Sequence, residues 1–486
     1  MDNHDFRLFP LRSINPLLSE QQLTALSTEL TGGGNHSPVA TTAQATTLFN
    51  NTKGAAVKPQ LNTPIYPHHR IDAGYTYLGQ FIAHDIVPKS NPREQCRPLS
   101  PWLNLDSLYG HPSNDTEGKA VFDDSLFDAD GQFLIHTNQF DARRDANGRA
   151  IIAEPRNDEN AVIIQLHVVW QKVHNLIVKQ LPQPHTRTSN IQRARCQVLA
   201  LFHLIVIDDF LRRLLEPTVF RYYFQDWRAG VLPAEHSLTS IPVEFSHAGF
   251  RFGHSMTLGF YDLNSMPDNV FSLADLLRSP SSPPLQAKHQ IEWSKFFGGN
   301  ALEARRMSML ISMDMTHIPI EGNIIHINLL AGQNKQLPTA KQIIDWLITS
   351  HPQLATAIEL ETYPQVTADS DKRLAGAYHT LADNFAHERL PLWLYILGEA
   401  KLNPPPNTKT KLGKVGSIIN AEVLRSSIVS CYFHKTDNIL SANSLMSLLQ
   451  RNAGDLYLQI RDNSPDGCCT MFNLINWINK ENNNEH

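Results

Sequence analysis

Residues 154–175 read EPRNDENAVIIQLHVVWQKVHN and carry the strongest structural signal in the chain. The carboxylates Asp158 and Glu159 near the start are favourable at the positive end of a helix dipole. Apolar residues then recur at spacings of three and four, which is the period of an amphipathic helix. The apolar positions are Val162, Leu166, Val169, Val173 and Leu176. The stretch therefore predicts a long helix from about residue 158 to residue 180.

The same apolar spacing recurs from Gly74 onward, whereas strictly alternating apolar and polar residues are scarce. It predicts a second helix at about residues 191–215. Loops rich in Pro and Ser interrupt the pattern, but none is long enough to force a domain boundary. We therefore expect a mainly α fold with a single large helical domain at residues 71–480. Residues 1–70 show little helical periodicity and predict an irregular N-terminal arm that belongs to the same globule.

The composition excludes several classes of protein. The chain has 486 residues, with 42 Lys and Arg against 47 Asp and Glu, and a formal net charge of −5. This balance gives no basic field, so we expect no nucleic-acid partner. The longest apolar stretch, near residues 198–207, is too short to span a bilayer, so we expect no transmembrane segment. Nothing in the sequence indicates an oligomeric state.

The expected compartment follows from the first residues and from the cysteines. The chain begins MDNHDFRLFPLRSIN, which lacks a basic segment followed by an apolar one. Its five cysteines form no CxxC pair and cannot supply a disulfide framework. We expect a cytoplasmic protein, or one exported without a classical signal peptide.

Two motifs place polar side chains on or beside predicted helices. In residues 74–90, GYTYLGQFIAHDIVPKS, Gln80 and His84 lie four apart and share one helical face. Arg156 stands just before the long helix, where a guanidinium can be held rigidly at a buried site. A single histidine on a helix is more often a core or surface residue than a catalyst, so its neighbours decide its role.

A third motif, residues 247–260, reads HAGFRFGHSMTLGF and places Arg251 and His254 on either side of a glycine. A histidine three residues after an arginine can ligate iron while the arginine holds an acidic group of the ligand. His167 and His174 lie seven apart on the long helix, which is too far for one metal ion. We interpret both of these histidines as structural.

The order of these motifs resembles the animal heme peroxidase family. The family reads GQFxDHD, RxxExxxxxxxHxxxxxxHN, RxGH and LNxxRGxxxGLP. In the same order, this chain reads GQFIAHD, RNDENAVIIQLHVVWQKVHN, RFGH and INLLAGQNKQLP. The resemblance covers about residues 70–430, and it implies one helical heme peroxidase domain that holds heme b.

On the distal side of the heme, the resemblance implies that His84 is the base, Gln80 its neighbour and Arg156 the cation. Cleavage of a bound peroxide needs a base that moves a proton from one oxygen to the other. It also needs a nearby positive charge that stabilises the developing negative charge.

Three distal positions bear on covalent attachment of the heme. Glu159 matches a position that forms an ester to the heme in family members. Ala83 and Asn160 replace the other two residues through which members of the family link to heme. We therefore expect at most one covalent link, through Glu159, and noncovalent heme is equally compatible with the sequence.

On the proximal side, the resemblance implies that His254 ligates the iron and that Asn328 hydrogen-bonds its other ring nitrogen. Such a bond orients an imidazole and makes it a better electron donor. Arg251 would meet a heme propionate. Ala331 occupies a position where the family has an arginine near the propionates. Weaker retention of heme is the expected consequence.

A calcium site also follows from the resemblance, because Asp85 comes directly after the distal histidine and SPWLNLDSLYG ends in the family's Tyr-Gly. Hard oxygen ligands suit calcium. The implied ligands are the side chains of Asp85, Ser100, Asn104 and Asp106 and the carbonyl of Trp102. The family usually has Asp in place of Asn104 and Ser in place of Asp106, so two carboxylates remain. A plain polar loop is the alternative.

The expected function is reduction of hydrogen peroxide with oxidation of a small-molecule electron donor, organic or halide. A fatty-acid dioxygenase of the same superfamily is one alternative. Such enzymes carry a tyrosine three residues before the proximal histidine, and Arg251 stands there in this chain. The other alternative is a heme-binding protein without turnover, which would not need Gln80, His84 and Arg156 together.

Overall fold

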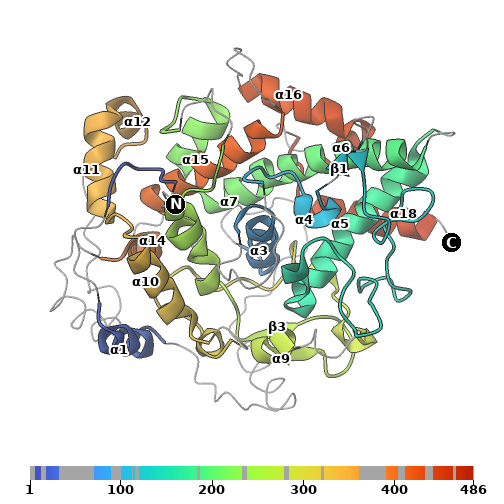
Figure 1. Ribbon diagram of the computed structural model, residues 1–486, viewed down its shortest axis with the longest axis horizontal. Coiled ribbons are helices and arrows are strands. Elements are labelled where there is room, and N and C mark those ends of the chain that lie inside the picture. The colour runs from blue at the N-terminus through green and yellow to red at the C-terminus, as the bar shows by residue number, and fades with distance from the viewer. Residues whose placement is uncertain are drawn as a thin grey trace.

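The structure is a computed structural model. It describes residues 6–12, 18–31, 71–88, 100–111, 113–114, 120–182, 186–232, 238–278, 284–318, 322–360, 390–402, 411–432, 442–462 and 467–484. Helices dominate these ranges (Figure 1). The strands within them form two antiparallel pairs, β1 (Ser113–Asn114) with β2 (Ala120–Val121) and β3 (Phe260–Asp262) with β4 (Val270–Ser272). The mainly α fold expected from the sequence is therefore confirmed.

The α-helices are α1 (Glu20–Leu30), α3 (Gly74–Ile86), α4 (Asp106–Tyr109), α5 (Ala161–Gln180), α6 (Arg187–Ile205), α7 (Arg212–Leu214), α8 (Pro217–Phe220), α9 (Leu273–Arg278), α10 (Ile324–Asn334), α11 (Ala340–Ser350), α12 (Pro352–Ala357), α14 (Leu392–Leu402), α15 (Lys414–Ser430), α16 (Ala442–Ala453), α17 (Asp455–Ile460) and α18 (Met471–Asn484). Tighter 3-10 turns are η1 (Pro155–Asp158), η5 (Arg251–Ser255), η7 (Ala287–His289), η8 (Trp293–Lys295) and η9 (Met313–Thr316). Wider π turns are η2 (Val206–Leu211), η3 (Arg221–Gln225) and η4 (Phe245–Gly249).

The predicted long helix is α5, and it lies in the hydrophobic core. Asn160 begins the helix, because its side chain accepts hydrogen bonds from the backbone N–H groups of Val162 and Ile163. The acidic residues that precede it lie in η1 and its end, so α5 begins slightly later than predicted. α5 is long and apolar enough to cross a membrane, but most of it is buried against other parts of the protein. It is therefore a core helix.

The second predicted helix is α6, which changes to π geometry at η2 and continues into α7. Asp209 lies in this π turn and accepts a hydrogen bond of 2.8 Å from the hydroxyl of Tyr75 on α3. Arg213 Nε donates to the same carboxylate at 2.6 Å. These contacts fix the N-terminal end of α3 against the α6–α7 segment.

The N-terminal arm contains a helix that the sequence did not predict. Ser19 and Gln22 form a reciprocal capping box at the start of α1. Leu23, Leu26 and Leu30 are buried on one face, and α1 packs against α10. The spacing of three and four extends over only 11 residues, within a stretch otherwise rich in Thr, Asn, Pro and Gly. Residues 32–70 of the arm lie outside the described residues.

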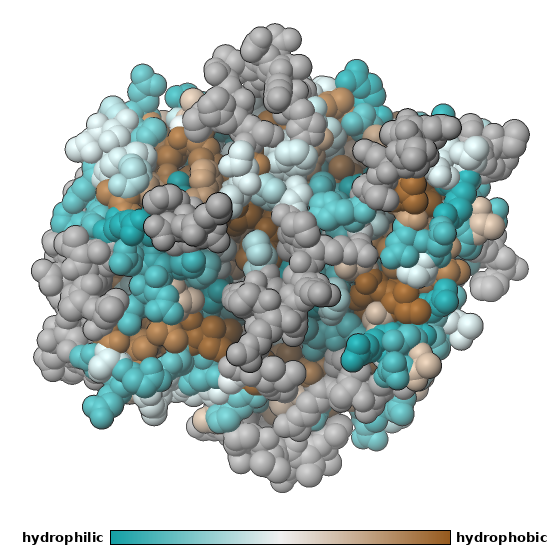
Figure 2. Space-filling view, viewed as in Figure 1, coloured by the Kyte–Doolittle hydropathy of each residue, from teal (hydrophilic) through white to brown (hydrophobic). Residues whose placement is uncertain are grey.

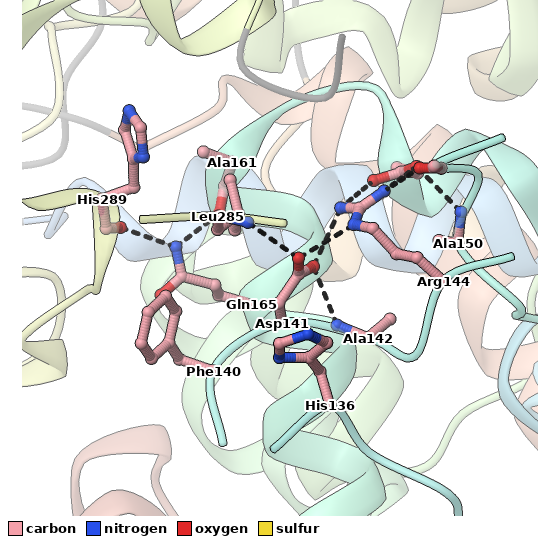
Figure 3. Close-up of polar contacts among 12 residues, drawn as sticks. His136, Phe140, Asp141, Ala142, Arg144, Ala150, Ala161, Gln165, Leu285 and His289 are labelled. Atoms are coloured by element: carbon pink, nitrogen blue, oxygen red, sulfur yellow. Dashed lines mark hydrogen bonds and ion pairs between the residues drawn. The ribbon is translucent and has the colours of Figure 1, made fainter. Parts of the chain in front are cut away.

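The segment that leads into η1 is held by a buried ion-pair network (Figure 3). Arg144 donates to both carboxylate oxygens of Asp141, at 2.8 Å each, and to both oxygens of Asp158, at 2.8 and 2.9 Å. Asp141 also accepts the backbone N–H of Leu285 at 2.9 Å. This network anchors η1, and therefore the functional residues beside Asp158.

The face of the molecule in Figure 2 shows apolar residues at separate places between polar ones. The exposed large apolar residues in the described ranges are scattered in the sequence: Val121, Met266, Ile348 and Leu458. The cysteines within those ranges, Cys196, Cys431, Cys468 and Cys469, are free thiols.

Candidate active site

The candidate site is built around α3, near the centre of the molecule (Figure 1). Most of this helix is buried, but Gly79, Gln80 and Ala83 are partly accessible. These positions lie on one face of the helix, as the spacing of three and four requires. α3 contacts both η1, which carries Arg156, and η5, which carries His254. The structure therefore brings all three sequence motifs together.

His84 has a defined partner at Nδ1. This nitrogen lies 2.9 Å from Oδ1 of Asn157, and the ring is 7% exposed. An amide oxygen can only accept, so the imidazole donates from Nδ1 and keeps a lone pair on Nε2. Nε2 lies 3.8 Å from a carboxylate oxygen of Glu159, whose side chain is 40% exposed. His84 thus presents the basic nitrogen on the side of the partly exposed Glu159.

Arg156 supports His84 through the backbone. Its guanidinium donates to the main-chain carbonyls of His84 at 2.8 Å and Val87 at 2.9 Å. It also pairs with Glu154, with Nε at 2.9 Å from Oε1. Burial opposes ionisation of Glu154, but the hydrogen bonds and charge of Arg156 outweigh it and lower the pKa of this carboxyl. Arg156 therefore satisfies free carbonyls at the negative end of α3.

Gln80 is linked to the start of α5. Its side-chain oxygen accepts a hydrogen bond of 3.3 Å from the amide of Asn160. Asn160 uses its other side-chain atom, Oδ1, to begin α5. Gln80, His84 and Glu159 thus line one region between α3 and the junction of η1 with α5.

The proximal motif is also assembled. Nδ1 of His254 lies 3.0 Å from Nδ2 of Asn328 on α10. Oδ1 of the same amide accepts a hydrogen bond of 2.6 Å from Arg251, which also donates to the carbonyl of Ser246 at 2.9 Å. Burial and the charge of Arg251 lower the pKa of His254 to about 3. The ring is therefore neutral at pH 7 and can act as a metal ligand.

The surroundings of His254 fit a flat ligand. A Cβ added at Gly253 would meet nothing within 4 Å, which shows open space beside the histidine. His254 itself is partly accessible, as are Gly79 and Ala83 on the facing helix. A neutral, partly accessible imidazole beside open space, on an element that contacts α3, matches what heme requires of its proximal side.

The loop that precedes α4 wraps around Asp85. Both oxygens of this buried carboxylate accept backbone N–H groups, from Leu105 at 2.9 Å and from Ser107 at 2.8 Å. Burial and the neighbouring Asp106 raise the pKa of Asp85 to about 7. Asp106 Oδ1 accepts from Arg195 at 3.2 Å, and Oδ2 lies 3.1 Å from a ring nitrogen of His111.

The other implied calcium ligands lie in the same loop. The side-chain oxygens of Ser100 and Asn104 accept the backbone N–H groups of Trp102 and Asp106, each at 3.1 Å. Oγ of the neighbouring Ser107 is buried without a hydrogen-bond partner among the described residues. Within those residues, no group of three His, Cys, Asp or Glu side chains is arranged to hold a metal ion. The candidate calcium site has two carboxylates, Asp85 on α3 and Asp106 at the start of α4, so a calcium ion there would depend on neutral oxygens as well.

The chain belongs to the animal haem peroxidase family. The sequence profile with that description matches residues 47–317, which is more than half of the chain. Human thyroid peroxidase is 24% identical over 225 residues, which cover 41% of this chain and 23% of that protein. A peroxidase-like protein of Margaritifera margaritifera is 33% identical over 129 residues, 25% of this chain and 16% of the relative. The matched regions thus span less than a quarter of these relatives.

Solved structures show the same fold. Peroxidase A from Dictyostelium discoideum aligns with a TM-score of 0.51 and 13% identity, covering 98% of this chain and 92% of that one. Fatty acid alpha-dioxygenase of Oryza sativa aligns with a TM-score of 0.52 and 13% identity, covering 83% and 75% of the two chains. The fold is therefore shared by a peroxidase and a dioxygenase.

Two functional neighbours were not predicted from the sequence. Asn157 contacts His84, and its amide nitrogen lies 3.1 Å from Nδ1 of His167. His174 is structural as interpreted, because it binds the hydroxyl of Tyr109 and the carbonyl of Gly131. His167, by contrast, is linked to His84 through the side chain of Asn157. Asn157 follows Arg156 directly, and no sequence pattern distinguishes it from an ordinary turn residue.

Proposed function

We propose that the protein is a heme-dependent peroxidase that reduces hydrogen peroxide and oxidises a small-molecule electron donor, organic or halide. One observation carries this proposal: α3, which carries His84, contacts both η1, which carries Arg156, and η5, which carries the neutral, partly accessible His254. A heme-binding protein without turnover needs the second histidine alone. The distal arrangement of His84 with Arg156 is what supports catalysis.

The residues around His84 and His254 fit heme b as the cofactor. His254 would hold the iron through Nε2, because Nδ1 faces Nδ2 of Asn328. An amide N–H donates, so the proton of the neutral ring is on Nε2 in this orientation, and binding of the iron would displace it. Arg251 is the cation beside this histidine, and it would meet a propionate. When bound, heme supplies the electron-transfer chemistry, while the protein positions it and shapes its surroundings. Glu159 is the one residue of the distal cluster that we propose for an ester link.

The distal residues would move a proton between the two oxygens of hydrogen peroxide. Nε2 of His84 would accept the proton from one oxygen and return it to the other. The O–O bond then breaks, the protonated oxygen leaves as water with the bonding electron pair, and the two electrons that the remaining oxygen needs would come from the heme. Asn157 holds the ring in the tautomer that permits this transfer. Arg156 keeps the backbone of His84 in place and adds positive charge near the reacting oxygens, and Gln80 lies one helical turn away.

We also propose calcium at the loop around Asp85, with Ser100, Asn104, Asp106 and the carbonyl of Trp102. The support is the pair of buried carboxylates and the unpartnered hydroxyl of Ser107 beside them. Arg195 and His111 compete for Asp106. Calorimetric titration of the chelator-treated protein with Ca²⁺ tests the site, and Asp85→Asn should abolish the heat of binding. Equal heats in both proteins would refute it.

The decisive experiment for the function is the optical spectrum of the heme-loaded protein before and after hydrogen peroxide. We expect a rapid spectral change that is reversed by phenols or halides, with slower change in His84→Gln. A wild type that binds heme but does not respond to peroxide would overturn the proposal in favour of a binding protein. Oxygen uptake with linoleate, in place of peroxide consumption, would overturn it in favour of a dioxygenase.

Covalent attachment is tested separately by extracting heme from the denatured protein. We expect any resistant fraction to disappear in Glu159→Gln. Resistant heme in that variant would place the link elsewhere.

A further inference from the structure

Asn157 lies fully buried between two histidines. Its oxygen faces Nδ1 of His84 at 2.9 Å, and its nitrogen faces Nδ1 of His167 at 3.1 Å. Asn157 and His167 are both 0% exposed. One side chain therefore connects the distal histidine to a histidine inside α5, away from the proposed heme.

The backbone around Asn157 is fixed on both sides. Arg156 is bound to Glu154 and to the carbonyls of His84 and Val87. On the other side, Asp158 accepts hydrogen bonds from both terminal nitrogens of Arg144. The backbone of Asn157 is thus held in place. Only rotation of its side chain could change whether the amide oxygen or the amide nitrogen faces His84.

The direction of the two hydrogen bonds follows from the orientation of the Asn157 amide, whose oxygen faces His84 and whose nitrogen faces His167. Burial lowers the pKa of His167 to about 3, so the ring is neutral at pH 7 and carries one N–H. With the nitrogen of Asn157 donating to Nδ1 of His167, that proton is on Nε2, which is buried without a hydrogen-bond partner among the described residues. The oxygen of Asn157 is then available to accept from Nδ1 of His84. His84 consequently keeps the lone pair on Nε2.

The reverse orientation of the amide would have the opposite effect. Asn157 would donate to Nδ1 of His84 and accept from Nδ1 of His167. The proton of His84 would then be on Nε2, where it blocks acceptance of a proton from peroxide. The two histidine tautomers are coupled through one amide, because an amide has one donating and one accepting end.

We propose that Asn157, anchored by His167, is a positioning residue that selects the proton-accepting tautomer of His84. This inference rests on the proposed peroxidase function, since it concerns the base of that reaction. Asn157 itself touches neither peroxide nor heme in the proposal. Loss of a partner that orients a functional histidine typically costs roughly 10- to 100-fold in activity.

The test compares three variants. Asn157→Leu removes both hydrogen bonds at similar volume. Asn157→Asp keeps an oxygen that accepts from Nδ1 of His84. Its second oxygen can accept from His167 once that ring carries its proton on Nδ1, so this variant should keep the wild-type tautomer of His84. Asn190→Leu is the matched control, because Asn190 is 3% exposed, donates to the carbonyl of Asp130 and contacts neither histidine.

The first readout is the tautomer of His84 in the heme-free protein. Ring-nitrogen NMR shifts of ¹⁵N-histidine-labelled protein report it, and the signal is assigned by its loss in His84→Gln. We expect a protonated Nδ1 and an unprotonated Nε2 in the wild type, in Asn157→Asp and in Asn190→Leu. Asn157→Leu should show a mixture of the two tautomers. An unchanged His84 tautomer in Asn157→Leu would overturn the proposal.

The second readout is the peroxide-dependent spectral change of the heme-loaded proteins. We expect Asn157→Leu to slow it by roughly 10- to 100-fold, with an unchanged spectrum before peroxide, whereas Asn157→Asp stays near the wild type. Equal rates in Asn157→Leu and Asn190→Leu would overturn the positioning role. If the wild type does not react with peroxide, the proposed function fails, while the NMR comparison still decides whether Asn157 sets the tautomer.

Discussion

Replacement of Arg156 by alanine tests whether the hydrogen bonds of this residue stabilise the folded protein around His84, in addition to any effect of its charge. The guanidinium makes four hydrogen bonds, two to Glu154 and one each to the carbonyls of His84 and Val87. The two paired side chains are only 10% and 9% exposed. Removing one partner of a buried pair typically costs about 3–5 kcal/mol, because the remaining charge is left uncompensated. We expect the free energy of unfolding to fall by that amount.

A second variant separates the charge of Glu154 from the lost hydrogen bonds. Arg156→Ala combined with Glu154→Gln removes the unpaired carboxylate, and we expect it to recover about 1–3 kcal/mol of the loss. Urea unfolding of the heme-free proteins at pH 7 measures both values. The double variant should still react slowly with peroxide, because the carbonyl of His84 has lost its donor.

The pH dependence gives an independent check. The pKa of Glu154 is lower in the folded protein than its ordinary value of 4.5. Its pairing therefore stabilises the fold above pH 4.5, and this contribution is lost as the pH falls through the folded pKa. The difference in stability between the wild type and Arg156→Ala should shrink over that acidic range. A loss below about 1 kcal/mol at pH 7, or a double variant no more stable than the single one, would refute the structural role.

Further predictions concern heme binding and, separately, the ion-pair network around Arg144 (Figure 3). His254→Ala should abolish the Soret band of the heme-loaded protein, and an unchanged band would show that another histidine is the ligand. Ala331→Arg should slow transfer of heme to apomyoglobin, since it adds a cation near the propionates; equal transfer rates would count against this placement. Arg144→Met should lower the free energy of unfolding by about 3–5 kcal/mol, and adding Asp158→Asn should recover part of it. Denaturant unfolding measures both free energies, and a double variant no more stable than Arg144→Met would contradict the prediction.

The sequence predicted the helices and the motifs better than the contacts among them. The period of α5 and the spacing of the motifs are local properties, so they were readable without the fold. α1 was missed because its apolar period extends over only 11 residues, within an arm otherwise rich in Thr, Asn, Pro and Gly. The change to π geometry within η2 was also missed, because it accompanies long-range contacts of Asp209 with α3 and α18.

The same holds for the candidate site, where the residues could be predicted from the sequence but the contacts among them could not. His84, Arg156 and His254 could be named from the sequence, but the direction in which each side chain is bound could not. Arg156 was expected to act as a distal cation, and the structure adds its hold on the backbone of His84. Asn157 has no local pattern, because its role depends on two histidines that lie on different helices.

The attachment of α3 at both ends has a consequence for folding during synthesis. Tyr75, near the start of the helix, binds Asp209, which lies 134 residues later in the chain. Arg156 follows His84, near the other end, by 72 residues. Asp209 in turn accepts the backbone N–H of Met471 at the start of α18, 262 residues further on. The start of α3 therefore cannot be attached until Asp209 has been synthesised, and Asp209 gains its bond to α18 only much later, so a heme site built around α3 is expected to be completed late in folding.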